Sequence, residues 1–163
     1  MSELEEAIAL HASPSNAGEW RAFADPRYEA GTGMFGGWTA AVLLRSVIGD
    51  ARAHGTPSAI TVSYVRQVKP GNELKIAARP LGGSRSLTFW NAELAVAGQD
   101  EVAAVASVLM AQRRPTDAFD EWSMPNAPDP ATLPVTHPPG AFGERTEARP
   151  VHPQTLFDQP STR

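Results

Sequence analysis

The sequence predicts an α+β domain in which an antiparallel sheet wraps around one buried helix. Residues 34–48 form a helix-length segment that is apolar on nearly every side, with Arg45 as its only charged residue. A helix of this kind has to be buried on most of its surface, because it offers water no polar face. Four strand-like segments follow it, separated by short glycine-containing turns typical of hairpins. This order favours a sheet that curves around the helix.

Length, composition and charge describe one globular domain with an additional segment. The chain has 163 residues, of which 42% are hydrophobic and 20% charged, and its formal net charge is -4. The 14 basic residues are dispersed among acidic ones, so we expect no nucleic-acid partner. There is no cysteine, and the four histidines lack the spacing of a metal site, so we expect no bound metal. The longest apolar run is shorter than the roughly 20 residues that cross a bilayer, which predicts a cytoplasmic protein without a membrane span.

The N-terminal elements precede the buried helix. Residues 1–17 are expected to form an arm with a short helix, because Ser2 and Glu5 have the spacing of a capping box. Residues 18–24 are expected to form a strand, which a glycine-rich loop connects to the helix. Gly49 is expected to end the helix, since glycine is frequent just beyond a helix C-terminus.

The remaining strands are expected over residues 58–69, 72–81, 84–97 and 101–113. In the first of these, Ile60, Val62 and Tyr64 alternate onto one face. Tyr64 and Trp90 are expected to pack in the core. The last strand is apolar on both faces, which is typical of a central strand covered on each side. An antiparallel sheet curved around one central helix is the hot-dog architecture, and this is the fold that the sequence predicts.

The composition changes at Arg114. Ten of the 15 prolines lie between Pro115 and Pro160, and the alternation typical of strands stops there. Proline fixes φ and has no N–H to donate to a sheet, so this stretch is expected to be extended. The sequence therefore predicts a hot-dog domain over residues 18–114 and a proline-rich tail or linker over residues 115–163.

Several short motifs occur in a characteristic order along the chain. They are GMFGGW at residues 33–38, SYVRQVKPG at 63–71, GSRS at 83–86, ASVL at 106–109, and WSMP at 122–125 followed by RPV at 149–151. In order and spacing these motifs resemble the type II (TesB-like) acyl-CoA thioesterases, over roughly residues 18–152. The resemblance implies a hydrolase that cleaves the thioester of an acyl-coenzyme A by attack of water, without a metal or an organic cofactor.

The resemblance also indicates which catalytic residues to look for. In that family the catalytic Asp, Ser or Thr, and Gln lie in a second hot-dog repeat, and this sequence ends where that repeat would begin. Internal symmetry projects the three positions onto Thr39, onto Pro57 or Ser58, and onto Val108 or Leu109.

Thioester hydrolysis needs a group that holds or deprotonates a water molecule. Thr39 is a weak base, and the nearest acids are Asp25 and Glu29, in the loop before the buried helix. Either carboxylate could activate water, or it could be an ordinary solvated loop residue. Thr39 and Asp25 are the catalytic candidates. Asp50 and His54 follow the helix and are expected to be surface residues at its opposite end.

Substrate-binding candidates come from the start of the helix and from two arginines. The N–H groups of the first helical turn could bind a thioester oxygen, or the glycines there could simply allow the helix to approach the sheet closely. The two arginines could contact the phosphates of coenzyme A or form surface salt bridges. The candidates are Phe35, Gly36, Gly37, Trp38, Arg66 and Arg85. Tyr64 and Trp90, expected in the core, could instead line an acyl channel, and so could Trp38.

Two functions remain open from the sequence. The first is an acyl-CoA thioesterase, either a single hot dog that pairs with a second copy or the N-terminal half of a tandem enzyme. Pairing would cover an open sheet edge and compose a substrate groove, so a homo-oligomer is expected in both cases, and within a tandem chain the second repeat fills the place of the partner. The second is a non-catalytic module that binds acyl-CoA and lacks the residues that activate water.

Overall fold

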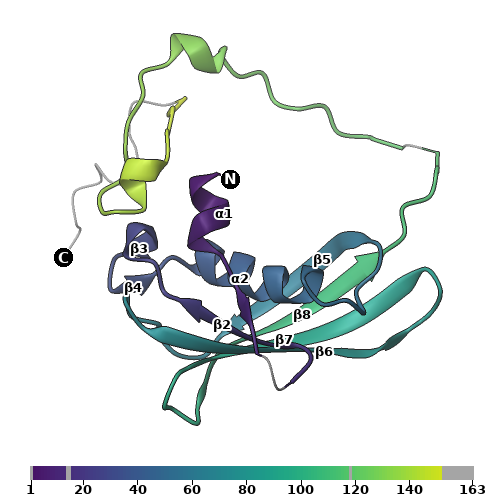
Figure 1. Cartoon of the computed structure of the whole chain (residues 1–163). Coiled ribbons are helices and arrows are strands. Elements are labelled where there is room, and N and C mark those ends of the chain that lie inside the picture. The colour runs from purple at the N-terminus through teal and green to yellow at the C-terminus, as the bar shows by residue number, and fades with distance from the viewer. Residues whose placement is uncertain (1, 14–15, 118, 152–163) are drawn as a thin grey trace. The chain divides into compact units, whose positions relative to one another are not determined.

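The computed structural model describes residues 2–13, 16–117 and 119–151. The chain divides into two units, residues 1–114 and residues 115–163. The first unit has the predicted hot-dog fold, in which a six-stranded antiparallel sheet curves around the helix α2 (Gly36–Ile48) (Figure 1). The strands lie in the order β1 (His11–Ala12), β2 (Glu19–Phe23), β6 (Glu73–Gly83), β7 (Leu87–Val96), β8 (Val102–Ala111) and β5 (Thr56–Tyr64).

The central helix α2 buries one face against the sheet. Its buried side chains are Trp38, Thr39, Val42, Leu43, Ser46 and Val47. α2 packs mainly against β6, β7 and β8, and burial of each large apolar side chain contributes about 1.5–3 kcal/mol. The helix ends at Gly49 as predicted, where a Cβ atom would lie 3.2 Å from the ring of Trp20. The burial expected on most sides of the helix is confirmed, and the exposed residues Gly37, Arg45 and Ile48 lie on a narrow outer stripe.

The predicted strands are present as β2, β5, β6, β7 and β8, with shifted ends. β8 is a central strand as predicted, with β7 on one side and β5 on the other. Trp90 is 1% exposed, which confirms its predicted place in the core. Tyr64 is 56% exposed, so the prediction that it packs in the core is wrong. β5 is the last strand of the sheet and receives little cover from α2, which leaves its inner face open.

Short elements surround the start of α2. A 3-10 helix (Pro26–Tyr28) leads into a two-stranded ribbon of β3 (Glu29–Ala30) and β4 (Gly33–Met34). The sequence does not predict β1, β3 or β4, because two residues are too few to show an alternating pattern.

The predicted N-terminal helix is α1 (Glu3–Ala7), and it has the predicted capping box. The backbone N–H of Glu5 donates to Oγ of Ser2 at 3.2 Å, and the Ser2 backbone N–H donates to Oε2 of Glu5 at 2.7 Å. The indole N–H of Trp38 donates to the carbonyl oxygen of Ala7 at 3.1 Å. This bond ties α1 to α2.

The second unit has little regular structure in its described part. One 3-10 turn (Pro130–Thr132) precedes an antiparallel bridge between Thr136 and Ala148, and a second (Gly143–Arg145) lies in the loop that this bridge closes. The guanidinium of Arg149 donates to two carbonyl oxygens of the same unit, at 2.8 Å and 3.1 Å. Among the residues that the structure describes, no helix has both the length and the apolar character needed to cross a membrane.

Candidate functional site

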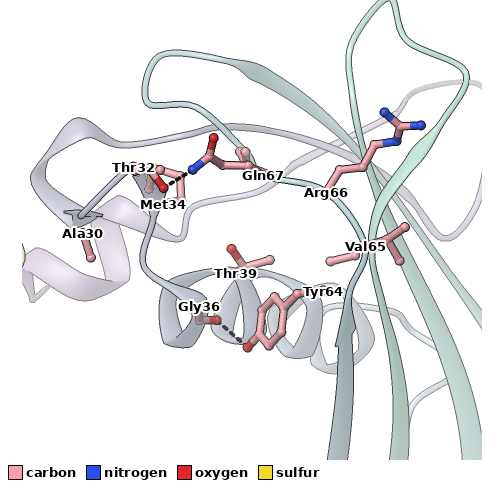
Figure 2. Close-up of a pocket in the computed structure, with 12 residues that line it drawn as sticks. Ala30, Thr32, Met34, Gly36, Thr39, Tyr64, Val65, Arg66 and Gln67 are labelled. Atoms are coloured by element: carbon pink, nitrogen blue, oxygen red, sulfur yellow. Dashed lines mark hydrogen bonds between the residues drawn. The ribbon is translucent and has the colours of Figure 1, made fainter. Parts of the chain in front are cut away.

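A cavity of about 370 Å³ lies at the N-terminal end of α2 (Figure 2). Its walls are the β3–β4 ribbon, the first turn of α2, and the segment that follows β5. The lining residues are Ala30, Thr32, Gly33, Met34, Gly36, Thr39, Tyr64, Val65, Arg66, Gln67, Val68 and Ala104. The cavity therefore lies where the free edge strand meets the start of the buried helix.

Close backbone packing holds two walls of the cavity together. The N–H of Met34 donates to the carbonyl oxygen of Val68 at 2.9 Å. A Cβ atom on Gly33 would lie 2.6 Å from Cγ of Gln67 and 2.6 Å from that same carbonyl oxygen. A residue with a side chain at position 33 would push the ribbon away from the segment after β5. Gly33 thus has a steric role in shaping the cavity.

The first turn of α2 presents backbone N–H groups at this end of the helix. Phe35 is the N-cap and makes no side-chain capping bond, and the first bond within the helix runs from Thr39 N–H to Phe35 C=O at 3.2 Å. The N–H groups of the first turn have no acceptor within the helix, and the helix dipole adds partial positive charge. Such groups can stabilise negative charge that develops on a carbonyl oxygen.

Two side chains supply further polar groups to the cavity. Thr39 is 4% exposed, and Figure 2 shows its hydroxyl pointing into the cavity. The side-chain amide of Gln67 donates to the hydroxyl of Thr32, and its carbonyl oxygen can still accept a hydrogen bond. The cavity lining contains no Asp, Glu or His among the described residues. It can therefore bind a carbonyl group and position a water molecule, but it offers no strong base.

Three of the candidates from the sequence line this cavity: Gly36, Thr39 and Arg66. Gly36 is held in place by the hydroxyl of Tyr64, which donates to its carbonyl oxygen at 2.8 Å. Arg66 also forms an ion pair with Glu101, so the surface salt bridge considered for it is present as well.

Three other substrate-binding candidates from the start of α2 lie outside the cavity lining: Phe35, Gly37 and Trp38. Trp38 is 1% exposed and contacts α1, which gives it a structural role. The ring of Phe35 covers Gly37, where a Cβ atom would lie 2.3 Å from it.

Arg85 lies at the other end of the sheet from Arg66. The Arg66 N–H bonds to the Ala103 carbonyl, whereas Ser86, next to Arg85, bonds to the N–H of Gln112. From Ala103 to Gln112 the chain advances nine residues along β8 and its extension, which corresponds to about 30 Å. The structure does not bring the two arginines together within one domain.

Asp25 does not line the cavity either. Its carboxylate accepts a hydrogen bond from the backbone N–H of Arg27 at 3.0 Å, and from Nη2 of the same residue at 2.6 Å. These bonds cap the 3-10 helix, and the bond to Asp25 raises the pKa of the Arg27 guanidinium above its usual value. Asp25 thus stabilises a loop, and Glu29 in β3 is likewise outside the lining.

The expected surface position of Asp50 is wrong, whereas that of His54 is right. The Asp50 side chain is only 4% exposed and is paired with Arg52, whose Nη2 lies 2.7 Å from Oδ2. Hydrogen bonding from the Arg52 side chain lowers the pKa of Asp50 despite partial burial. His54 is exposed.

Sequence reasoning missed Gln67 and Thr32 as parts of the site, and it gave Tyr64 a place in an acyl channel only as the alternative to core packing. Gln67 and Tyr64 lie inside the SYVRQVKPG motif, but no local pattern shows that this segment faces the start of α2. The contact between residues 33 and 68 is long-range, and only the folded chain reveals it.

Comparison with known proteins agrees with this architecture. A family model described as acyl-CoA thioesterase N-terminal domain matches residues 24–111. No curated protein sequence matches the chain.

Three solved structures illustrate the fold. A hot-dog protein of unknown function from Alicyclobacillus acidocaldarius matches with a TM-score of 0.83 at 25% identity, over 91% of this chain and 55% of that one. A proposed thioesterase II from Thermobifida fusca matches with a TM-score of 0.73 at 21% identity, over 90% and 53% of the two chains. The acyl-CoA thioesterase II TesB2 from Mycobacterium marinum matches with a TM-score of 0.65 at 18% identity, over 80% and 47%.

This chain spans about half the length of the three solved proteins that it resembles. The identities are low, and the last two similarities establish the shared fold alone. The family match covers more than half of the chain, including α2 and strands β5 to β8. The chain belongs to the acyl-CoA thioesterase N-terminal domain family.

Proposed function

We propose that this chain is the thioester-binding hot-dog unit of an acyl-CoA thioesterase. The observation that carries the proposal is the uncapped N-terminus of α2, which opens onto a cavity that Thr39 and Gln67 also line. The thioester carbonyl would lie against the N–H groups of the first helical turn. Arg66, at the rim, is suited to a phosphate of coenzyme A because its guanidinium matches phosphate oxygens.

Hydrolysis at this site needs three events. The oxygen of water bonds to the carbonyl carbon, the oxyanion that forms is stabilised by the helix N–H groups, and the carbon–sulfur bond breaks to release coenzyme A as a thiolate. The Thr39 hydroxyl and the Gln67 carbonyl can hold the attacking water. A base that accepts the proton from water has to come from outside the cavity lining, because that lining holds no carboxylate or imidazole among the described residues.

A second hot-dog unit that pairs along β5 is our proposed source of that base. Within the described part of the chain, β5 pairs with β8 alone, and on its inner face Ile60 is 39% exposed and Tyr64 56% exposed. An open edge strand of this kind is a template for another strand. The second unit can be another copy of this chain or a following repeat, for which residues 115–163 would be the linker.

A non-catalytic acyl-CoA-binding module is the alternative. The absence of Asp, Glu and His from the described cavity lining favours it. Both functions predict binding of acyl-CoA, and only the first predicts release of coenzyme A.

Two measurements on the 163-residue chain test these functions. One is thiol release from short, medium and long acyl-CoAs, and the other is calorimetric binding of a non-hydrolysable thioether analogue. Thr39→Val removes the cavity hydroxyl with little change in shape, and we expect about tenfold weaker binding or turnover. Thr61→Val is the matched control, because Thr61 is exposed on β5 and pairs with Ser107 on the outer face.

The outcomes separate the two functions. Turnover that Thr39→Val lowers and Thr61→Val does not supports the hydrolase. Binding without turnover supports the binding module, or a site whose base lies in another unit. A chain that neither binds nor hydrolyses acyl-CoA contradicts both.

A further inference from the structure

One end of the sheet carries three arginines, and the strand segments around them contain no Asp or Glu between residues 74 and 92 or between residues 102 and 116. Arg85 lies in the β6–β7 connection, and Arg113 and Arg114 follow β8 after one intervening residue, Gln112. A backbone hydrogen bond of 2.9 Å from Gln112 to Ser86 holds these segments side by side. Figure 1 shows this connection at the opposite end of the sheet from β3 and β4. We call these three arginines the basic end.

Among the described residues, no carboxylate forms an ion pair with the basic end. Within the part of the chain that the structure describes, the side chains of the basic end make no ion pair or hydrogen bond. By contrast, Arg79 and Arg52 are each paired with a carboxylate.

Exposed apolar side chains lie beside the basic end. Trp90 is buried against α2, and side chains alternate along a strand, so Leu87 and Phe89 face the outer side of the sheet. Phe89 is 50% exposed, Leu87 39% and Leu81 62%. In the register of β7 and β8, Phe89 lies opposite Leu109 and Leu87 opposite Ala111. We use the name hairpin patch for five residues: Leu81, Leu87, Phe89, Leu109 and Ala111.

The combination favours an anionic surface with an apolar interior as the partner. A second copy of the chain fits poorly, because a symmetric contact of two such ends would place arginine against arginine. A nucleic acid would pair with the arginines but would leave the apolar side chains without a partner. A membrane that contains anionic phospholipid satisfies both, since apolar side chains enter the headgroup region and arginines bind phosphates.

We propose that the basic end and the hairpin patch form a docking surface for membranes that contain anionic phospholipid. The protein would bind at the membrane surface without crossing the membrane, and this docking surface lies about 30 Å along the sheet from the cavity at α2. It does not depend on the proposed hydrolysis, so it is measured without any acyl-CoA present.

Flotation of the full chain with lipid vesicles tests the proposal. We expect binding to vesicles of phosphatidylcholine mixed with phosphatidylglycerol, weaker binding at high salt, and little binding to phosphatidylcholine alone. Arg85→Gln should weaken binding about fivefold, and Phe89→Ser about tenfold. Arg21→Gln is the matched control, because Arg21 is an exposed arginine on β2 whose register neighbour Lys75 lies toward the other end of the sheet.

A loss of vesicle binding by Arg85→Gln can be distinguished from a loss of folding. Arg85→Gln changes an exposed side chain in a turn and is expected to leave the melting temperature unchanged. The proposal is overturned if the wild-type chain does not bind the mixed vesicles, or binds them no better than phosphatidylcholine. It is also overturned if Arg21→Gln weakens binding as much as Arg85→Gln does.

Discussion

The hydroxyl of Tyr64 donates a hydrogen bond of 2.8 Å to the carbonyl oxygen of Gly36, which joins the free edge strand β5 to the first turn of α2. The Tyr64 ring also lies against Gly36, where a Cβ atom would be 3.3 Å from it. This contact fixes one wall of the cavity. It connects the strand proposed to pair with a second unit to the helix end proposed to bind the thioester.

Tyr64→Phe removes this hydrogen bond and keeps the ring. Because the side chain is half exposed, we expect the free energy of unfolding to fall by only about 0.5–1 kcal/mol. We expect weaker binding of the thioether analogue, since the first turn of α2 is less firmly held. Urea denaturation and calorimetry measure the two effects. Binding as strong as that of the wild type would show that the wall does not depend on this bond.

Gly33→Ala should damage the cavity through backbone packing. The new Cβ would be 2.6 Å from the Val68 carbonyl oxygen, a backbone atom that cannot turn away. We expect a loss of about 1–3 kcal/mol in stability and a loss of analogue binding. Gly31→Asn is the control in the same loop, because Gly31 has φ +67, which Asn tolerates, and open space around it. Equal effects of the two changes would contradict the steric explanation.

Trp38→Phe tests the link between α1 and α2. It removes the 3.1 Å bond to the Ala7 carbonyl and leaves a small void in the core. We expect the stability to fall by about 1–3 kcal/mol. Five residues are too few for a stable isolated helix, so the amide protons of α1 should also exchange faster. Trp122→Phe is the control, because Trp122 is 86% exposed. Unchanged exchange in α1 would show that other contacts hold it.

The hot-dog fold could be predicted from the sequence because its main signals are local. The apolar run of α2, the Gly49 stop and the apolar character of both faces of β8 each reflect neighbours within one element. The position of β5 at the sheet edge is different, since it depends on how the strands are ordered in space. The alternation in β5 predicts a core position for Tyr64, but at the edge of the sheet α2 covers this residue only in part and leaves it 56% exposed.

The site was predictable only in part for the same reason. Gly36 and Thr39 belong to the start of α2, which the sequence identifies directly. Gln67 reaches the cavity through contacts between segments that are more than 30 residues apart, as its bond to Thr32 shows. The position of Asp25 before the helix predicts a catalytic carboxylate, but Arg27, two residues later, donates hydrogen bonds to that carboxylate and holds it in the loop.

Asp50 should make stability depend on pH in the acidic range. Arg52 donates to its carboxylate through Nε at 2.9 Å and Nη2 at 2.7 Å, and the Arg52 guanidinium also lies 5.7 Å from the centre of the Trp90 ring. The hydrogen bond from Arg52 lowers the pKa of Asp50 in the folded state. A lowered carboxyl pKa stabilises the fold above the unfolded value of about 3.9, and this contribution is lost as the pH falls through the folded value.

Asp50→Asn tests this linkage. At neutral pH we expect it to lower the free energy of unfolding by about 1–2 kcal/mol, because a charged hydrogen-bonded pair with one buried partner is broken. The difference from the wild type should shrink as the pH falls below about 4, where the wild-type carboxyl also becomes neutral. Urea denaturation at a series of pH values measures it. Asp100→Asn, at an exposed position, should show no such trend. A difference between Asp50→Asn and the wild type that stays constant down to the lowest pH would mean that the Asp50 side chain acts through its shape and not through its charge.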